Sequence, residues 1–221
     1  MVNKKTNLDK MDDALKDNLK DFFCNLCGEY GINNMKAEHY IRLKQILSDV
    51  NNIITMKATK AFVKTLKDDK FISNTVYKTI LTTVLNTNPN ANGYDAQYDG
   101  GNGNKKFIAE VKCNIPISKG VLGNNKIDGI KTDIKNLFIG KWKVIKTNNK
   151  YYEDYYKFFV VMTCESIEKL KRDNIRDCMD KIINPINATK VYRGKILYYD
   201  DLPNKNDLNT DNVYVVFVSI D

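Results

Sequence analysis

The chain has 221 residues, with 35 Lys plus Arg against 27 Asp plus Glu and one His, so its formal net charge is +8 at neutral pH. A single histidine excludes the multi-histidine metal sites of many hydrolases within one chain, so hydrolytic chemistry would have to rest on carboxylates, lysine and a hard metal ion. No stretch approaches the roughly 20 apolar residues of a membrane span, and the first 20 residues are charged throughout, without an apolar h-region and cleavage site. We therefore expect a cytoplasmic protein with no membrane partner.

The first 85 residues have the apolar spacing of amphipathic helices. Apolar side chains recur at intervals of three, four and seven residues over 8–30 and 35–54, and shorter helical patterns follow at 59–67 and 73–85. Cys24 and Cys27 lie three apart in the first of these patterns, which favours packing on one buried helix face over half of a zinc site.

The pattern changes at residues 86–93, a cluster of turn-forming residues. Strands are predicted at 93–98 and 106–112 around a glycine-rich turn, then a helix at 126–139, a buried central strand at 156–163 and a polar helix at 166–183. Two later strands are predicted at 195–199 and 213–220. The order indicates an α/β fold in one domain, 1–221, with a mostly helical part at 1–85 and an α/β core at 86–221.

The excess positive charge is concentrated in one block. Residues 105–150 contain eleven lysines against three acidic side chains, a net charge equal to that of the whole chain. Lysines interleaved with Asn and Gly are typical of a surface that neutralises phosphates, so nucleic acid is the expected partner. The alternative is a compositional bias, because Lys and Asn are both favoured by AT-rich coding.

The two predicted strands at 93–98 and 106–112 carry a candidate metal site. Alternation along a strand sets Glu110 and Lys112 on one face and Ala109 and Val111 on the other. If the strands form a hairpin, Asp95 faces residue 109 or 110, and the second register brings Asp95 beside Glu110. Two adjacent carboxylates favour a bridging cation, for which Mg²⁺ is the natural choice.

The expected roles follow from charge. Asp95 and Glu110 would bind Mg²⁺, the backbone carbonyl of Val111 could be a further ligand, and Lys112 could orient the attacking water and offset charge on phosphoryl oxygens. The alternative is a hairpin with solvated charges on its open face.

Residues 93–95 and 109–112, Gly-Tyr-Asp and Ala-Glu-Val-Lys, resemble the motif of the PD-(D/E)xK nuclease superfamily, and within it the type II restriction endonucleases. The resemblance implies a core with a mixed central β-sheet flanked by helices, in which Asp95, Glu110 and Lys112 are catalytic. It also implies a further acidic residue from a preceding helix, for which Glu38 is the first candidate and Glu29 the second. Tyr94 stands where the motif has Pro, a position that supplies no catalytic atom.

The resemblance further implies a homodimer that cuts both strands of double-stranded DNA at a palindromic site, with bases read by loops and helix ends. The expected reading loop spans 114–126, where the candidate DNA-binding residues are Lys119, Asn124, Asn125 and Lys126. An ordinary turn with solvated lysines is the alternative. At the level of function, the alternatives to a restriction enzyme are a structure-specific nuclease of the same fold and a non-catalytic nucleic-acid-binding protein.

Overall fold

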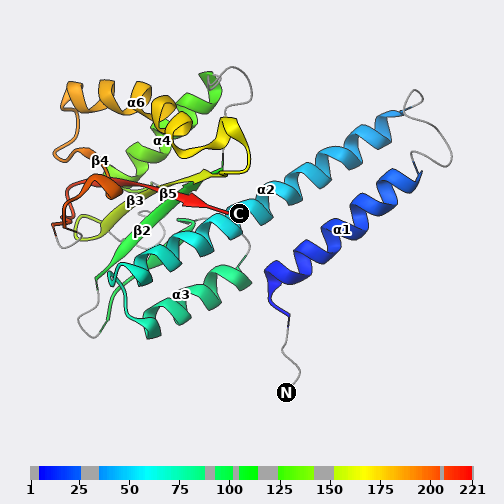
Figure 1. Cartoon of the computed structure of the whole chain (residues 1–221), viewed down its shortest axis with the longest axis horizontal. Helices are drawn as coiled ribbons and strands as arrows, with labels where there is room; N and C mark the ends of the chain where they lie inside the picture. Colours follow the sequence, from blue (N-terminus) through cyan, green and yellow to red (C-terminus); the bar gives the residue numbers. More distant parts are fainter. Residues whose placement is uncertain are drawn as a thin grey trace.

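The computed structural model describes residues 5–25, 35–87, 93–101, 105–113, 124–141, 152–204 and 207–220 (Figure 1). Three helices come first, and strands and helices then alternate. The elements are α1 (Asn7–Asn25), α2 (Ala37–Asp68), α3 (Asn74–Asn86), β1 (Ala96–Tyr98), β2 (Phe107–Lys112), α4 (Asn124–Ile139), β3 (Tyr156–Thr163), the 3₁₀ turn η3 (Glu168–Leu170), α6 (Arg172–Thr189), β4 (Ile196–Tyr198), the 3₁₀ turn η4 (Tyr199–Asp201) and β5 (Val213–Ser219).

The strands form one mixed sheet in the order β1-β2-β3-β5-β4. β1 is antiparallel to β2, and the other three pairings are parallel. The mixed sheet flanked by helices and the helical N-terminal region are therefore confirmed. β3 lies at the centre with seven of its eight residues buried, as its continuous apolar sequence predicts.

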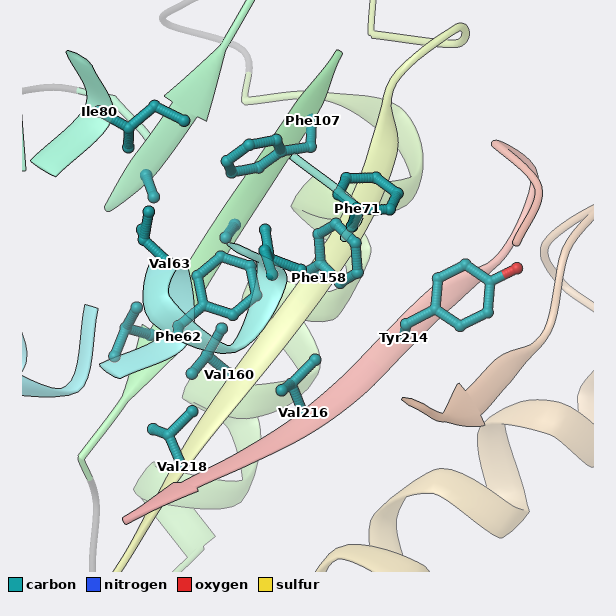
Figure 2. Close-up of a cluster of buried hydrophobic side chains, with 14 of the residues drawn as sticks. Phe62, Val63, Phe71, Ile80, Phe107, Phe158, Val160, Tyr214, Val216 and Val218 are labelled. Atoms are coloured by element: carbon teal, nitrogen blue, oxygen red, sulfur yellow. The ribbon is translucent and has the colours of Figure 1, made fainter. Parts of the chain in front are cut away.

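Helices cover both faces of the sheet (Figure 1). The second half of α2, together with α3, covers one face, where Phe62, Phe107 and Phe158 pack in a cluster of aromatic and β-branched side chains (Figure 2). Helices α4 and α6 cover the other face with a second apolar cluster that includes Ile108 and Phe159. Successive residues of β2 and β3 thus alternate between the two cores, which fixes the face on which the charged residues of β2 lie.

The two helices expected at 35–54 and 59–67 are one continuous helix, α2, so the expected break is wrong. Residues 55–58 contain neither Gly nor Pro, and the hydroxyls of Thr55 and Thr59 donate to the carbonyls four residues earlier, at 2.9 and 2.7 Å. The first half of α2 projects past the sheet and packs against α1 (Figure 1).

Smaller differences concern helix ends and one cysteine. The expected helix at 166–183 begins only at Arg172, after the turn η3, and continues to Thr189. Cys24 is exposed, so the expectation of a buried cysteine pair is wrong for it, and Cys27 lies outside the described residues.

Within the described residues, no helix has both the length and the apolar character needed to cross a membrane.

Candidate functional site

The hairpin of β1 and β2 brings Asp95 and Glu110 together. Ala96 lies opposite Ala109, and one further step in the same register sets Asp95 opposite Glu110. Opposite residues of an antiparallel pair point to one face with Cβ atoms about 5 Å apart. Of the two registers that the sequence allows, the structure has the one that makes the carboxylates neighbours.

Asp95 directly precedes β1 and bonds to the edge of β2. Its Oδ2 accepts a hydrogen bond of 2.7 Å from the backbone N–H of Val111. The N–H and C=O of one strand residue point to the same side, so the Val111 carbonyl faces the edge where Asp95 lies. Burial raises the pKa of Asp95, while the Val111 N–H and the Lys141 ammonium oppose that shift.

Glu110 is buried, with 6% of its surface exposed. Its Oε1 lies 2.5 Å from the Nζ of Lys141, two residues past the C-terminal end of α4. Burial raises the pKa of Glu110 to about 8; the charge of Asp95 acts in the same direction, and Lys141 opposes it. The two carboxylates thus share a poorly hydrated place in which additional positive charge is favoured.

Lys141 has three contacts at this place. Besides Glu110, its Nζ donates to the backbone carbonyl of Gly93 at 2.5 Å and lies 5.0 Å from the centre of the Tyr94 ring. The Tyr94 hydroxyl accepts from the Lys141 backbone N–H at 3.2 Å and donates to the carbonyl of Asn136 at 3.1 Å. Tyr94 therefore fastens the segment before β1 to the end of α4.

Lys112 points to the same face as Glu110 and forms an ion pair with Asp133 of α4. Both side chains are about four-fifths buried, so the pair is more than a surface contact. The cluster as a whole contains three carboxylates, from Asp95, Glu110 and Asp133, and the two ammonium groups of Lys112 and Lys141.

The remaining candidates lie elsewhere. Glu38 is exposed in the first turn of α2, and Thr55, 17 residues later, is the part of α2 that contacts Cys113 after β2. At 1.5 Å per residue, Glu38 is about 25 Å farther along the helix. Glu38 is therefore not part of the cluster, and Glu29 lies outside the described residues.

The expected reading loop is only partly described. Lys119 lies outside the described residues. Asn124, Asn125 and Lys126 form the first turn of α4 and not a loop, with both asparagines exposed. Lys126 is seven residues from Asp133, so this turn lies about 10 Å along the helix from the cluster.

Sequence reasoning missed Lys141 and Asp133. A helix that leaves β2 and returns to a parallel neighbour must pack antiparallel to β2, so an acidic residue on α4 near Lys112 was a possible expectation. Gly140, with φ of 85°, ends α4 in the left-handed conformation and turns the chain back toward the sheet. A lysine directly after such a helix-ending glycine was the available signal for Lys141.

The oxygen atoms fit a hard divalent cation. Mg²⁺ in proteins takes one or two carboxylates and keeps several waters, and the site offers Asp95, Glu110 and the carbonyl edge at Val111. Within the described residues, no group of three or more His, Cys, Asp or Glu side chains could hold a metal ion. Two carboxylates and a backbone carbonyl, with water completing the coordination, are a donor set that Mg²⁺ accepts.

Comparison with known proteins gives no family for this chain. No family model matches it, and no curated protein or solved structure shows significant similarity to it. The function therefore has to be argued from the geometry of the cluster.

Proposed function

We propose that the chain is a Mg²⁺-dependent, sequence-specific endonuclease of double-stranded DNA, acting as type II restriction enzymes do. The observation that carries the proposal is the cross-strand pair Asp95 and Glu110, with Lys112 on the same face of the same strand. Hydrolysis of a phosphodiester without histidine needs these three groups: oxygens for the cation, a donor to water and positive charge near the phosphate.

Each residue would have a distinct part in the reaction. Asp95 and Glu110 would hold the cation, which when bound supplies Lewis acidity toward a phosphoryl oxygen and lowers the pKa of water. The Lys112 ammonium would donate a hydrogen bond to the attacking water and offset the charge that develops on the phosphate. Asp133 forms an ion pair with Lys112 and limits its orientations, because both side chains are mostly buried.

The end of β2 at the sheet edge would be the place where the DNA backbone meets the site. β1 has three residues and β2 has six, so the end of β2 with Val111 and Lys112 extends past its neighbour. The lysine-rich block 105–150 contains both Lys112 and Lys141. A phosphate at this edge would therefore meet positive charge from β2 and from the segment after α4.

Cleavage of a fully sequenced plasmid or phage duplex, with Mg²⁺ or with EDTA, tests the proposal. Discrete fragments with Mg²⁺ alone are expected, and their mapped ends give the recognition site. Asp95→Asn, Glu110→Gln and Lys112→Ala are each expected to lower the cleavage rate at least 100-fold, roughly the contribution of one catalytic group. Glu153→Gln changes an exposed glutamate outside the cluster and is the matched control.

The outcomes separate the proposal from its alternatives. Full cleavage by Asp95→Asn and Lys112→Ala would show that the active site lies elsewhere. Mg²⁺-dependent cutting of junctions or damaged duplexes, with intact duplex left whole, would indicate a structure-specific nuclease. DNA binding without any metal-dependent cutting would indicate a binding protein.

The proposal includes a homodimer, because a palindromic site presents equivalent phosphodiesters related by a two-fold axis. Tyr40, Ile41 and Leu47 on the projecting half of α2 are each more than half exposed and could take part in such a contact. Light scattering after size exclusion is expected to give twice the chain mass of 25.4 kDa. A chain that stays monomeric with and without DNA would contradict this part.

A further inference from the structure

The ammonium of Lys141 holds one of the two carboxylate oxygens that a cation bound to Glu110 would use. A carboxylate oxygen binds Mg²⁺ at about 2.1 Å, and Lys141 Nζ already lies 2.5 Å from Glu110 Oε1. Shared binding of one oxygen would hold two cations within roughly 5 Å of each other in a poorly hydrated place, where like charges repel strongly. The divalent cation and Lys141 therefore compete for Glu110.

The net charge of the cluster also indicates that a divalent cation and Lys141 compete. Three carboxylates and two ammonium groups leave one net negative charge when all are ionised, and Lys112 is already paired with Asp133. Entry of a divalent cation beside both ammonium groups would reverse the sign of the cluster. Departure of Lys141 from Glu110 restores the balance, because Asp95 and Glu110 together then match the charge of the cation.

The structure lets the Lys141 side chain leave without moving its backbone. The backbone N–H of Lys141 stays bonded to the Tyr94 hydroxyl, which in turn is bonded to Asn136. The side chain keeps 24% of its surface exposed, whereas that of Glu110 keeps 7%. Rotation about side-chain torsions would take the ammonium away from Glu110 and Gly93 while the backbone bond to Tyr94 is kept.

We infer that Lys141 is the resident counter-ion of the carboxylate pair and that a divalent cation must displace it to bind. The inference rests on the proposed function, which gives Asp95 and Glu110 their metal-binding role. Lys141 acts here as a positioning residue: it stabilises the metal-free fold and at the same time weakens metal binding. These two effects have opposite signs, and a purely structural lysine would produce only the first.

Calorimetric titration of the full chain with Mg²⁺, without DNA and at one fixed pH for all variants, tests the inference. Lys141→Met is expected to bind Mg²⁺ about tenfold more tightly than the wild type, yet to unfold at lower denaturant concentration in EDTA. Lys141→Gln keeps a neutral donor and is expected to bind more tightly as well. Lys141→Arg keeps the charge and is expected to bind no more tightly than the wild type.

Lys106→Met is the matched control. Lys106 also lies 2.5 Å from a carboxylate, that of Asp154, and 5.5 Å from a ring centre, that of Tyr155, but its ion pair is exposed and outside the cluster. Removing this lysine changes the net charge by the same amount, so its Mg²⁺ affinity is expected to equal that of the wild type.

Metal binding is read without cleavage, so the two proposals can fail separately. If the wild type binds Mg²⁺ and neither neutral variant binds more tightly, the inference is overturned while the metal site stands. If no variant binds Mg²⁺, the inference and the proposed metal site fall together. Tighter binding by both neutral variants supports the inference even if no DNA substrate is cut.

Discussion

Glu110 is a carboxyl group that faces the Lys141 ammonium, and in the proposed function a divalent cation would compete with that ammonium for it. It is buried beside Asp95, faces Lys141, and has a pKa raised to about 8. The proton is a competitor in its own right, since a protonated carboxyl group is a poor metal ligand. The pH of the solution therefore acts on this residue, and under the proposed function it would act on metal binding as well.

The first prediction concerns stability against pH in EDTA. The folded protein keeps the Glu110 proton up to about pH 8, whereas the unfolded chain loses it near 4.5, so the folded state binds more protons between these values. The free energy of unfolding should therefore fall as pH rises through this window, by at most about 1.4 kcal/mol per pH unit from this group. Glu110→Gln should lack this component.

Denaturant unfolding of the wild type and of Glu110→Gln from pH 5 to pH 9 measures the pH-dependent contribution of Glu110 to the free energy of unfolding. The difference between the two curves isolates Glu110 from Asp95, whose pKa is raised as well. The wild type should lose stability relative to the variant up to about pH 8 and then stay level. A difference that does not change with pH would show that Glu110 is ionised throughout the range.

At the scale of elements, α4 packs over the candidate site and contacts several of its residues. It supplies Asp133 to Lys112, accepts Tyr94 at Asn136, and ends just before Lys141. Gly129 lies within this helix, where a glycine costs more backbone entropy on folding than alanine does. Among the described residues, a Cβ at residue 129 would meet only the Nζ of Lys112, at 3.9 Å, an ordinary contact.

Gly129→Ala is therefore predicted to stabilise the protein, by about 0.5 to 1 kcal/mol. The midpoint of denaturant unfolding should rise while its slope stays the same. DNA cleavage should stay within a few-fold of the wild-type rate, because the added methyl group only touches Lys112. A loss of stability would show that α4 packs more tightly on β2 than the 3.9 Å contact indicates.

The opposite result is predicted for Gly194, which precedes β4. A Cβ at this residue would lie 1.8 Å from the backbone carbonyl oxygen of Asp211, in the turn before β5. The backbones approach closely here because Lys195 N–H donates to the Asn212 side chain at 2.8 Å. Gly194→Ala should thus cost about 3 kcal/mol or more, since backbone has to move. Thermal unfolding beside Gly129→Ala would measure the contrast, and equal melting temperatures would contradict it.

Elements with strong local patterns were predictable from the sequence. The bounds of β3 match the prediction, and those of α3 differ by one residue at each end, because a run of apolar residues and an N-capping Ser73 are local signals. The predicted break in α2 failed for a physical reason. A gap in apolar spacing ends a helix only if a residue there disfavours helix, and residues 55–58 do not.

Only the residues of the site that lie on the hairpin of β1 and β2 were predictable from the sequence. Alternation and a short turn limited Asp95 to two possible partners, and the packing of Ala96 and Ala109 against α2 and α3 selects Glu110. Lys141 lies 31 residues after Glu110, and its contact depends on how α4 packs on the sheet. No local pattern encodes that packing, so the counter-ion emerges only from the tertiary structure.

At the scale of the whole molecule, the chain has two parts that differ in the size of their apolar cores. The sheet and its helices share two large cores, in which Phe158 packs against the rings of Phe62, Phe71 and Phe107 (Figure 2). The projecting halves of α1 and α2 share a small cluster in which Phe22 and Ile46 are the buried members (Figure 1). The candidate site belongs to the first part.

Phe22→Ala is accordingly predicted to loosen the helical projection and leave the sheet intact. Phe22 is 4% exposed in a cluster with few other buried side chains, so its loss should open the projection locally before the whole chain unfolds. Hydrogen exchange should speed up in α1 and the first half of α2, with β2 and β3 unchanged. Phe158→Ala should instead cost about 3 to 5 kcal/mol globally and speed up exchange throughout.

Phe23→Ala removes a ring of the same size next to Phe22, but that ring is 57% exposed, so it should change exchange in the projection much less. If Phe22→Ala sped up exchange in β2 and β3 as much as in α1, the projection and the sheet would be one cooperative unit. The projection would then stabilise the site as well as extend from it. Retained exchange protection at Glu110 and Lys112 would show that the carboxylate pair needs only the sheet, α4 and the Lys141 segment.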